Sequence, residues 1–263
     1  MLTIARRQFA DLHRHGTFVI PNPFDVGSAK VLASAGYPAL ATTSSGLAAS
    51  LGKADQQVSL DELCAHVTAL TDAVDVPVQV DAEACYPHSP GVEHTVEALA
   101  DAGAAGVSIE DYDPVAGVVL DLPTATERVG IAAQAAHRHG MLLIARAENH
   151  LYAAGDVDDT VTRLAAFRAA GADVLYAPGV VAAADISRIV ALGAPVNVLA
   201  IAGIPSVRDL ADLGVRRVST GGALAWAAYG ALLRGADELR DQGSTGYLAG
   251  ALPAERRAVV FGG

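Results

Sequence analysis

The most informative part of the sequence is the stretch Pro77-Val78-Gln79-Val80-Asp81-Ala82-Glu83-Ala84. A proline opens it, a short, mostly apolar run follows, and two carboxylates one residue apart stand near its end. Such a run predicts a strand that is buried on both faces. In a barrel of parallel strands, the chemistry is built at the end where Asp81 and Glu83 stand.

These two carboxylates can face one point in space, because side chains at i and i+2 of an extended segment point the same way. Like charges aimed at one point repel unless a cation or a proton lies between them. A hard divalent cation such as Mg²⁺ suits oxygen ligands of this kind. The alternative is that Asp81 begins the next turn and Glu83 faces solvent.

On both sides of this stretch, short apolar runs alternate with helical patterns along the chain. The predicted strands are 17–20, 39–42, 77–80, 106–109, 141–145, 173–176, 195–199 and 216–219. Glycines such as Gly36, Gly103 and Gly171 end the helical patterns between them, as glycine commonly does at helix C-termini. The pattern predicts an α/β fold, a (β/α)8 TIM barrel in a single domain over 1–263, with a helical C-terminal segment from about residue 222.

Composition narrows the class of protein. The chain has 263 residues, is 52% hydrophobic and carries a formal net charge of −11, which argues against a nucleic-acid or anionic-membrane surface. With only two cysteines, neither a disulfide framework nor a C-x-x-C metal site is expected. We see no signal peptide and no run near the ~18 apolar residues of a membrane span, so we expect a cytoplasmic protein.

Polar residues gather just after the predicted strands, where a barrel brings them to one mouth. Each alone could cap a helix or contact solvent, but their joint occurrence favours a site for a cation and a small dianion. They are Asn22, Asp25, Ser44, Ser45, Asp81, Glu83, Glu110, Asp111, Arg146, Glu148, Asn197 and Ser219.

An ordered set of motifs resembles the isocitrate lyase/phosphoenolpyruvate mutase superfamily. The set comprises Ser45-Gly46-Leu47, Gly52-Lys53-Ala54-Asp55, Val80-Asp81-Ala82-Glu83, Ile109-Glu110-Asp111 and Ala145-Arg146-Ala147-Glu148. The resemblance runs from Asn22 to about Gly243. It implies a barrel that binds Mg²⁺, or Mn²⁺ in its place, together with a small 2-oxo acid or phosphonate.

The resemblance also implies roles for single residues. Asp81 would ligate the metal directly, while Glu83 and Glu110 would hold its waters. Arg146 would pair with a substrate oxyanion or carboxylate, with Asp55 and Glu110 beside it as further catalytic residues. The implied substrate-binding residues are Ser44, Ser45, Gly46, Leu47, Arg146 and Asn197. Residues 44–47 would donate backbone N–H groups to the substrate carboxylate. Asn197 and Asp55 would complete the pocket.

One departure from the family pattern is the segment after the fourth strand. The lyase branches carry a lysine-lysine-cysteine-glycine-histidine loop there, whereas residues 112–121 contain no cysteine, lysine or histidine. The general acid of those branches is therefore absent. Cys85 lies near the mouth but out of place for the thiol, and His88, His94 and His150 are the candidate proton carriers.

The favoured function is Mg²⁺-dependent cleavage of a carbon–carbon bond beside a 2-oxo acid through a pyruvate-type enolate. Decarboxylation of an oxaloacetate-like acid is the simplest case, because carbon dioxide leaves without a base. Phosphorus–carbon chemistry on phosphonopyruvate is the close alternative. A different class is a barrel that binds phosphosugars through Ser219-Thr220-Gly221-Gly222. A third class is a non-catalytic or regulatory barrel that keeps the ligand pocket.

Assembly is predicted from the last long helix. The segment Ala223-Leu224-Ala225-Trp226-Ala227-Ala228-Tyr229 carries more apolar surface than a barrel helix requires. Members of the resembled family pair by exchanging such a helix, and a large apolar patch usually marks an interface. We expect a homodimer or a homotetramer, and exchange of this helix between subunits is one way in which the subunits could pair.

Overall fold

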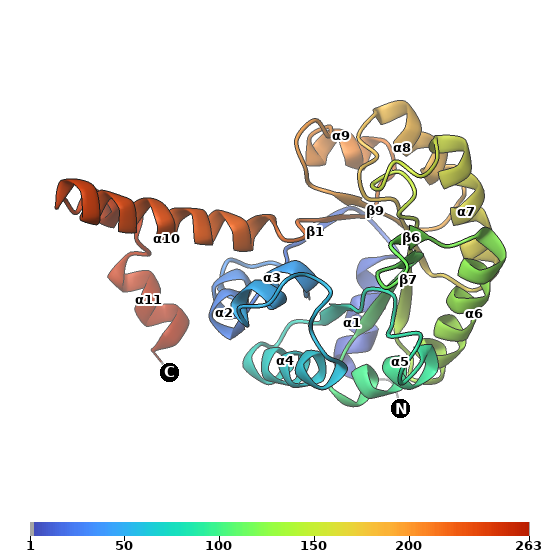
Figure 1. Ribbon diagram of the computed structural model, residues 1–263, viewed down its shortest axis with the longest axis horizontal. Coiled ribbons are helices and arrows are strands. Elements are labelled where there is room, and N and C mark those ends of the chain that lie inside the picture. Colours follow the sequence, from blue (N-terminus) through green and yellow to red (C-terminus); the bar gives the residue numbers. More distant parts are fainter. Residues whose placement is uncertain (1–2, 263) are drawn as a thin grey trace.

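The computed structural model describes residues 3–262 and shows a barrel of parallel strands with helices around it (Figure 1). The barrel strands are β1 (Phe18–Ile20), β2 (Leu40–Ala41), β3 (Val78–Asp81), β4 (Gly106–Glu110), β7 (Leu142–Arg146), β8 (Val174–Tyr176), β9 (Val196–Leu199) and β10 (Arg217–Ser219). Their order is β1-β10-β9-β8-β7-β4-β3-β2, and every pair is parallel. The predicted (β/α)8 barrel is confirmed.

Two hydrogen bonds draw the ends of this sheet together. The backbone N–H of Ala41 donates to the carbonyl of Pro21 at 3.1 Å, and the side-chain amide of Asn22 donates to the carbonyl of Thr42 at 2.7 Å. Both lie where β1 and β2 end. The barrel is therefore nearly closed, and its last link lies beside the mouth.

Helices surround the strands and follow the predicted pattern. Most begin at a side chain that caps them, such as Ser59, Asp121 and Asp156. The helices that cover the barrel strands are α2 (Val26–Ser34), α4 (Leu60–Ala73), α5 (Val92–Asp101), α6 (Leu122–Arg138), α7 (Val157–Ala169), α8 (Ala183–Val190) and α9 (Val207–Asp212).

Helix α1 (Ile4–Leu12) was not predicted, and it fixes the N-terminal end of the barrel. Its Phe9 is fully buried, and a Cβ added to Gly106 at the start of β4 would lie 2.6 Å from the Phe9 ring. Its Arg6 donates to the carbonyls of Ala100, Ala104 and His139 at 2.6 to 2.9 Å. Only glycine at position 106 allows this close approach.

Two segments expected as loops are ordered elements. Residues 44–47 form the first turn of α3 (Ser44–Ser50), which Thr43 caps by accepting from the N–H of Gly46. The segment after β4 folds into an antiparallel hairpin, β5 (Tyr112–Asp113) with β6 (Val118–Val119). The ring of Tyr112 stacks on that of Tyr152 with centroids 4.0 Å apart, which ties the hairpin to the segment after β7.

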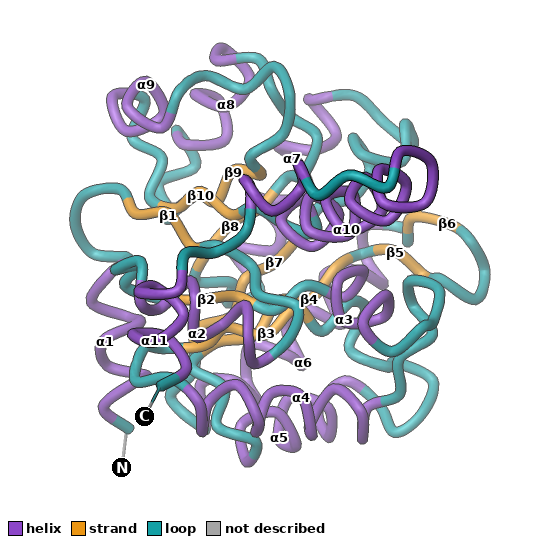
Figure 2. The backbone as a smooth tube through the Cα atoms, turned by 90° about the vertical axis from the view of Figure 1, so that its left-hand side faces the viewer, coloured by secondary structure: helices purple, strands orange, loops and turns teal. Residues whose placement is uncertain are grey.

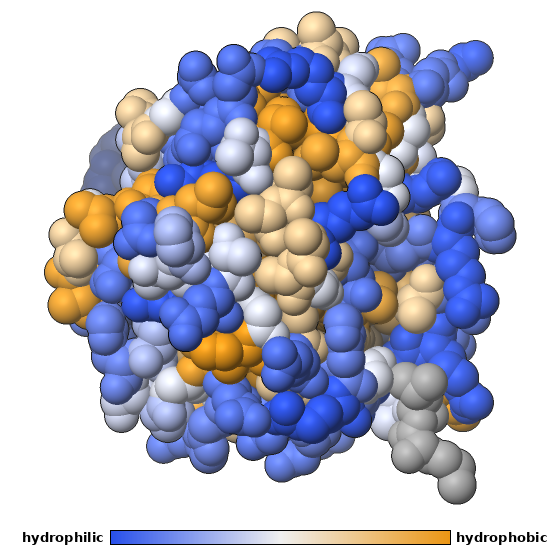
Figure 3. All heavy atoms as spheres, turned by 90° about the vertical axis from the view of Figure 1, so that its right-hand side faces the viewer, coloured by the Kyte–Doolittle hydropathy of each residue, from blue (hydrophilic) through white to orange (hydrophobic). Residues whose placement is uncertain are grey.

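The C-terminal elements leave the barrel. Helix α10 (Ala223–Gln242) extends away from it, and η1 (Gly246–Gly250) and α11 (Ala254–Phe261) turn back so that α11 packs against α2 (Figures 1 and 2). Trp226, Leu232 and Leu233 on α10 are 56%, 68% and 62% exposed. The opposite side of the molecule mixes hydrophilic residues with smaller apolar groups (Figure 3).

Within residues 3–262, no helix combines the length and the apolar character that crossing a membrane requires.

Candidate active site

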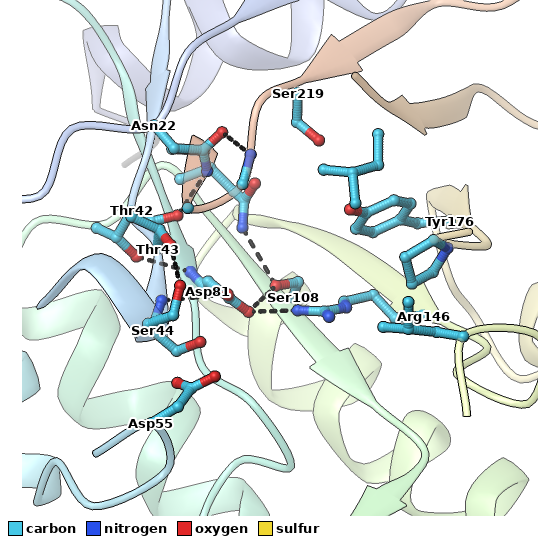
Figure 4. Close-up of a pocket in the computed structure, with 18 of the residues that line it drawn as sticks. Asn22, Thr42, Thr43, Ser44, Asp55, Asp81, Ser108, Arg146, Tyr176 and Ser219 are labelled. Carbon is cyan, nitrogen blue, oxygen red and sulfur yellow. Dashed lines mark hydrogen bonds and ion pairs between the residues drawn. The ribbon is translucent and has the colours of Figure 1, made fainter. Parts of the chain in front are cut away.

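A cavity of about 180 Å³ lies at the carboxyl ends of the strands (Figure 4). Most of its lining belongs to strand ends and the residues just after them, which is where barrel enzymes bind ligands. The polar and charged lining residues are Asn22, Thr42, Thr43, Ser44, Ser45, Asp55, Gln79, Asp81, Ser108, Arg146, Tyr176, Arg217 and Ser219.

Arg146, the last residue of β7, is the centre of the charged part of the site. Its Nη1 lies 2.7 Å from Asp81 Oδ1, its Nη2 3.2 Å from Glu110 Oε2, and its Nε donates to Glu148 Oε1 at 2.8 Å. Burial alone would lower the pKa of Arg146, but these carboxylates raise it well above its ordinary value. The guanidinium therefore stays charged.

Carboxylates outnumber the cation around this centre. Burial, followed by the charges of Asp81 and Asp55, raises the pKa of Glu83 to about 8. Burial likewise raises the pKa of Glu110, although Arg146 opposes the shift. Glu83 has a φ of 50°, and its Oε1 is buried without a hydrogen-bond partner. Either a bound cation or a proton on one of these carboxyl groups would relieve the repulsion between them.

The predicted metal ligands Asp81, Glu83 and Glu110 lie close to Arg146 rather than around an open cation site. In the described part of the chain, no three His, Cys, Asp or Glu side chains stand arranged as a ready cation site. Instead, Arg146 forms ion pairs with both Asp81 and Glu110. Their chemistry still fits Mg²⁺, since all donors are carboxylate oxygens and one oxygen of Glu83 lacks a partner.

The predicted substrate-binding segment faces the cavity through its first two residues. Ser44 and Ser45 line the cavity at the N-terminus of α3, and the N–H of Ser44 lies 3.4 Å from Asp81 Oδ2. Gly46 and Leu47 are buried behind them. A Cβ on Gly46 would lie 2.6 Å from the Thr43 methyl group, so glycine lets the helix begin here.

Asp55 lies where the sequence analysis places it, but Asn197 does not. Asp55 lines the cavity, and burial raises its pKa while a hydrogen bond with Ser44 opposes the shift. Asn197 is 1% exposed and does not line the cavity. Its amide donates to Ser219 Oγ at 2.9 Å and accepts from Arg217 Nε at 3.0 Å, so its polar atoms serve two lining residues.

The candidate acids named from the sequence lie outside the cavity. Cys85 is fully buried, with its Sγ 3.9 Å from the carbonyl of Ser108, and burial raises the pKa of its thiol. His88 lies 3.2 Å from Asp113 on the hairpin. Neither of these residues, nor His94 or His150, is among the residues that line the cavity.

Sequence reasoning missed six polar or charged lining residues, of which Thr42 and Thr43 directly follow β2. The other four are Gln79, Ser108, Tyr176 and Arg217. Each of these four lies within a strand rather than after it. The available signal was alternation, because Gln79 with Asp81 and Arg217 with Ser219 are two residues apart and share a face.

The fold and the site together are those of a barrel enzyme, with three carboxylates gathered around Arg146 at the end of the strands where such enzymes bind their ligands. The chain belongs to the phosphoenolpyruvate phosphomutase family, whose sequence profile matches residues 9–240. This places it in the isocitrate lyase/phosphoenolpyruvate mutase superfamily of lyases and mutases, and it is an enzyme of that superfamily.

Three relatives illustrate the relationship. The oxaloacetate decarboxylase of Paraburkholderia xenovorans is 33% identical over 237 residues, covering 86% of this chain and 76% of that protein. A crystal structure from Burkholderia cenocepacia, provisionally assigned as a lyase/mutase, is 42% identical with a TM-score of 0.93, covering 98% and 96% of the two chains. The structure of 2,3-dimethylmalate lyase is 27% identical with a TM-score of 0.85, covering 97% and 91%.

Proposed function

We propose that this protein is a Mg²⁺-dependent lyase that cleaves a carbon–carbon bond beside a 2-oxo acid through a pyruvate-type enolate. Decarboxylation of an oxaloacetate-like acid is the reaction that the site supports best. The observation that carries this choice is the cavity lining: among its described residues, none is a cysteine, histidine or lysine. Loss of carbon dioxide does not require the positioned acid that such side chains supply.

The proposal gives each group at the mouth a role. Ser44 and Ser45 at the start of α3 would hold the substrate carboxylate through backbone N–H groups. Arg146 would pair with the oxygen that becomes negative as the bond breaks, because its charge is already fixed at that point. Asp55 would bound the pocket beside Ser44.

The metal is part of the proposal. Asp81, Glu83 and Glu110 would hold Mg²⁺, or Mn²⁺ in its place, and the ion would act as a Lewis acid on the 2-oxo group. The single buried oxygen of Glu83 without a partner supports this assignment.

Phosphorus–carbon chemistry on phosphonopyruvate is the second candidate, and the description of the matching family favours it. The phosphosugar alternative has less support. The N–H groups of Thr220 and Gly221 both donate to Asn22 Oδ1 at 2.9 Å, so the amides that would bind a phosphate are already engaged.

The proposed partners are therefore a small 2-oxo acid or phosphonate and a second copy of the chain, without nucleic acid or membrane. A cytoplasmic location remains a prediction.

A substrate panel tests the proposed function. Oxaloacetate, phosphonopyruvate, isocitrate and 2-methylisocitrate are incubated with the protein, with Mg²⁺ or with EDTA, and product formation is followed enzymatically. We expect Mg²⁺-dependent release of pyruvate from oxaloacetate at a rate well above the protein-free reaction. Faster turnover of phosphonopyruvate than of oxaloacetate would favour phosphorus–carbon chemistry as the function. Equal rates in Mg²⁺ and in EDTA would show that the reaction does not need the metal.

A further inference from the structure

Arg217 of β10 is a buried positive charge at the deep end of the cavity. It is 2% exposed and lines the cavity, yet it forms no ion pair with any residue in 3–262. Its Nε donates to Asn197, while its Nη1 is buried without a hydrogen-bond partner. A buried charge without a counter-charge is costly, so an arginine in this state needs an anion from outside the chain.

The strand register shows where Arg217 lies relative to Arg146. Arg146 pairs with Tyr176, Tyr176 with Asn197, and Asn197 with Arg217 across successive strands from β7 to β10. The two arginines are therefore separated by two strands, β8 and β9, and both line the cavity. Arg217 precedes the mouth residue Ser219 by two residues, which is about 7 Å along a strand.

The surroundings of the two arginines differ sharply. Arg146 is held by three carboxylates, whereas the neighbours of Arg217 are the neutral Asn197 and the aromatic Tyr176. Burial, only partly opposed by Tyr176, lowers the pKa of Arg217 to about 10, so it remains protonated at neutral pH. Burial, and after it the charge of Arg217, lower the pKa of His13 to about 3, so His13 is neutral at neutral pH.

We propose that Arg217 is the second anion-binding group of the cavity and that it binds one carboxylate of a dicarboxylate while the other end of that acid lies at Arg146. This inference rests on the proposed class of substrate, and it adds a reason why a diacid would be preferred over a monoacid. Arg217 is a residue for substrate specificity, whereas Arg146 pairs with the 2-oxo oxygen that becomes negative as the bond breaks.

A binding experiment without turnover tests the inference. L-malate and 2-hydroxybutyrate differ only in a carboxylate against a methyl group, and neither carries the 2-oxo group that the proposed reaction needs. Both are titrated in Mg²⁺ buffer into the wild type, Arg217→Met, Arg217→Lys and the neighbouring control Arg216→Met, by calorimetry and by thermal unfolding. Sodium chloride is titrated in parallel.

We expect the wild type and Arg216→Met to bind malate about 30-fold or more tightly than 2-hydroxybutyrate, since truncating one partner of a buried charge pair costs at least that factor. Arg217→Met should lose this preference and should unfold, without ligand, at the same temperature as the wild type or higher. If Arg217 had only a structural role, Arg217→Met would unfold at a lower temperature than the wild type.

Three outcomes would overturn the inference. The first is an Arg217→Met variant that keeps the preference for malate. The second is a wild type that binds both acids equally. The third is an Arg217-dependent stabilisation by chloride with no preference for malate. If Arg217→Met does not fold, Arg217→Lys decides: weaker malate binding with unchanged 2-hydroxybutyrate binding supports the inference, and no change refutes it.

The result is separable from the proposed reaction. An Arg217-dependent preference for malate without any decarboxylation would leave the inference standing and remove the reaction. Decarboxylation of oxaloacetate together with an unchanged preference for malate in Arg217→Met would support the reaction and refute the inference about Arg217.

Discussion

Arg146 Nη1 and Asp81 Oδ1 lie 2.7 Å apart, although they end different strands, β7 and β3, on either side of β4. The contact brings the proposed metal ligand and the proposed oxyanion-binding group to one point (Figure 4). A substrate or a cation entering the cavity would compete for this pair. The charge balance of the site therefore depends on both residues together.

Replacing Arg146 with lysine should reduce kcat/KM for oxaloacetate by about 10²-fold or more, the usual cost of losing a preorganised donor at a developing charge. Lysine cannot reproduce the planar contacts that Arg146 makes with Asp81, Glu110 and Glu148. Steady-state kinetics measure the effect, and Arg188→Lys on the exposed surface of α8 is the matched control. Wild-type kinetics in Arg146→Lys would exclude Arg146 from the reaction.

Metal dependence should follow the order of the proposed ligands. EDTA should abolish activity and Mg²⁺ should restore it. Glu83→Ala should lose about 10- to 100-fold, as partners of metal-bound groups commonly do, and Asp81→Ala should lose more. Activity and Mg²⁺ titration calorimetry measure both effects, with exposed Glu127→Ala as the control. Calorimetry showing equal Mg²⁺ affinity in all variants would contradict this ligand set.

His13 should make the protein sensitive to acid. Burial and then the charge of Arg217 lower its pKa from 6.5 to about 3. The unfolded chain therefore binds a proton more readily, and the free energy of unfolding should fall as pH drops from about 6.5 toward 3, by up to about 1.4 kcal/mol per pH unit. Above 6.5 this contribution is fully present.

Urea unfolding at several pH values measures this slope. The ring of His13 packs edge-on against Phe9 and Phe18, so His13→Phe keeps an aromatic ring in place while removing the titration. The variant should show a flatter pH dependence than the wild type, and His15→Phe at an exposed position should not. Parallel slopes in the wild type and His13→Phe would refute the assignment.

The sequence predicted the barrel and much of its mouth for physical reasons that the structure makes visible. Buried parallel strands are nearly continuous apolar runs, and Asp81, Glu110 and Arg146 interrupt those runs at their ends. Position within the barrel then places them together without knowledge of any side-chain contact.

Other features depend on contacts that no local pattern records. Helix α3 begins with Ser44-Ser45-Gly46, small residues whose sequence pattern is typical of a loop. The helix begins there because the side chain of Thr43 caps it. A polar group within a strand, such as Arg217, is indicated in the sequence only by its spacing of two residues from a mouth residue, here Ser219. The family resemblance assigned Asn197 to the pocket, but its amide is engaged with Ser219 and Arg217.

The exposed face of α10 should mediate assembly. Leu232 and Leu233 are 68% and 62% exposed on a helix that extends from the barrel (Figure 1). We expect a homodimer or homotetramer by light scattering, and Leu232→Glu with Leu233→Glu should shift the mass toward the monomer. Val115→Glu, at an 82% exposed valine on the hairpin, is the control. A wild-type monomer at micromolar concentration would contradict this prediction.

The segment after β4 leads to a prediction about which substrates the enzyme does not cleave. Isocitrate and 2-methylisocitrate should turn over about 10²- to 10⁴-fold more slowly than oxaloacetate, because their cleavage requires a positioned acid to protonate a carbanion carbon. Residues 112–121 form the β5–β6 hairpin and its flanks and supply no thiol, and Cys85 is fully buried. Oxaloacetate should be spared, because its enolate can take a proton from water after carbon dioxide has left.

Rates on the three acids under identical Mg²⁺ make the comparison. A tricarboxylate that turns over as fast as oxaloacetate would mean that another group serves as the acid. Cys85→Ser and His88→Gln would then identify it, since Cys85 lies behind Ser108 and His88 contacts Asp113 on the hairpin. A selective loss of tricarboxylate cleavage in one of these variants would identify that side chain as the acid.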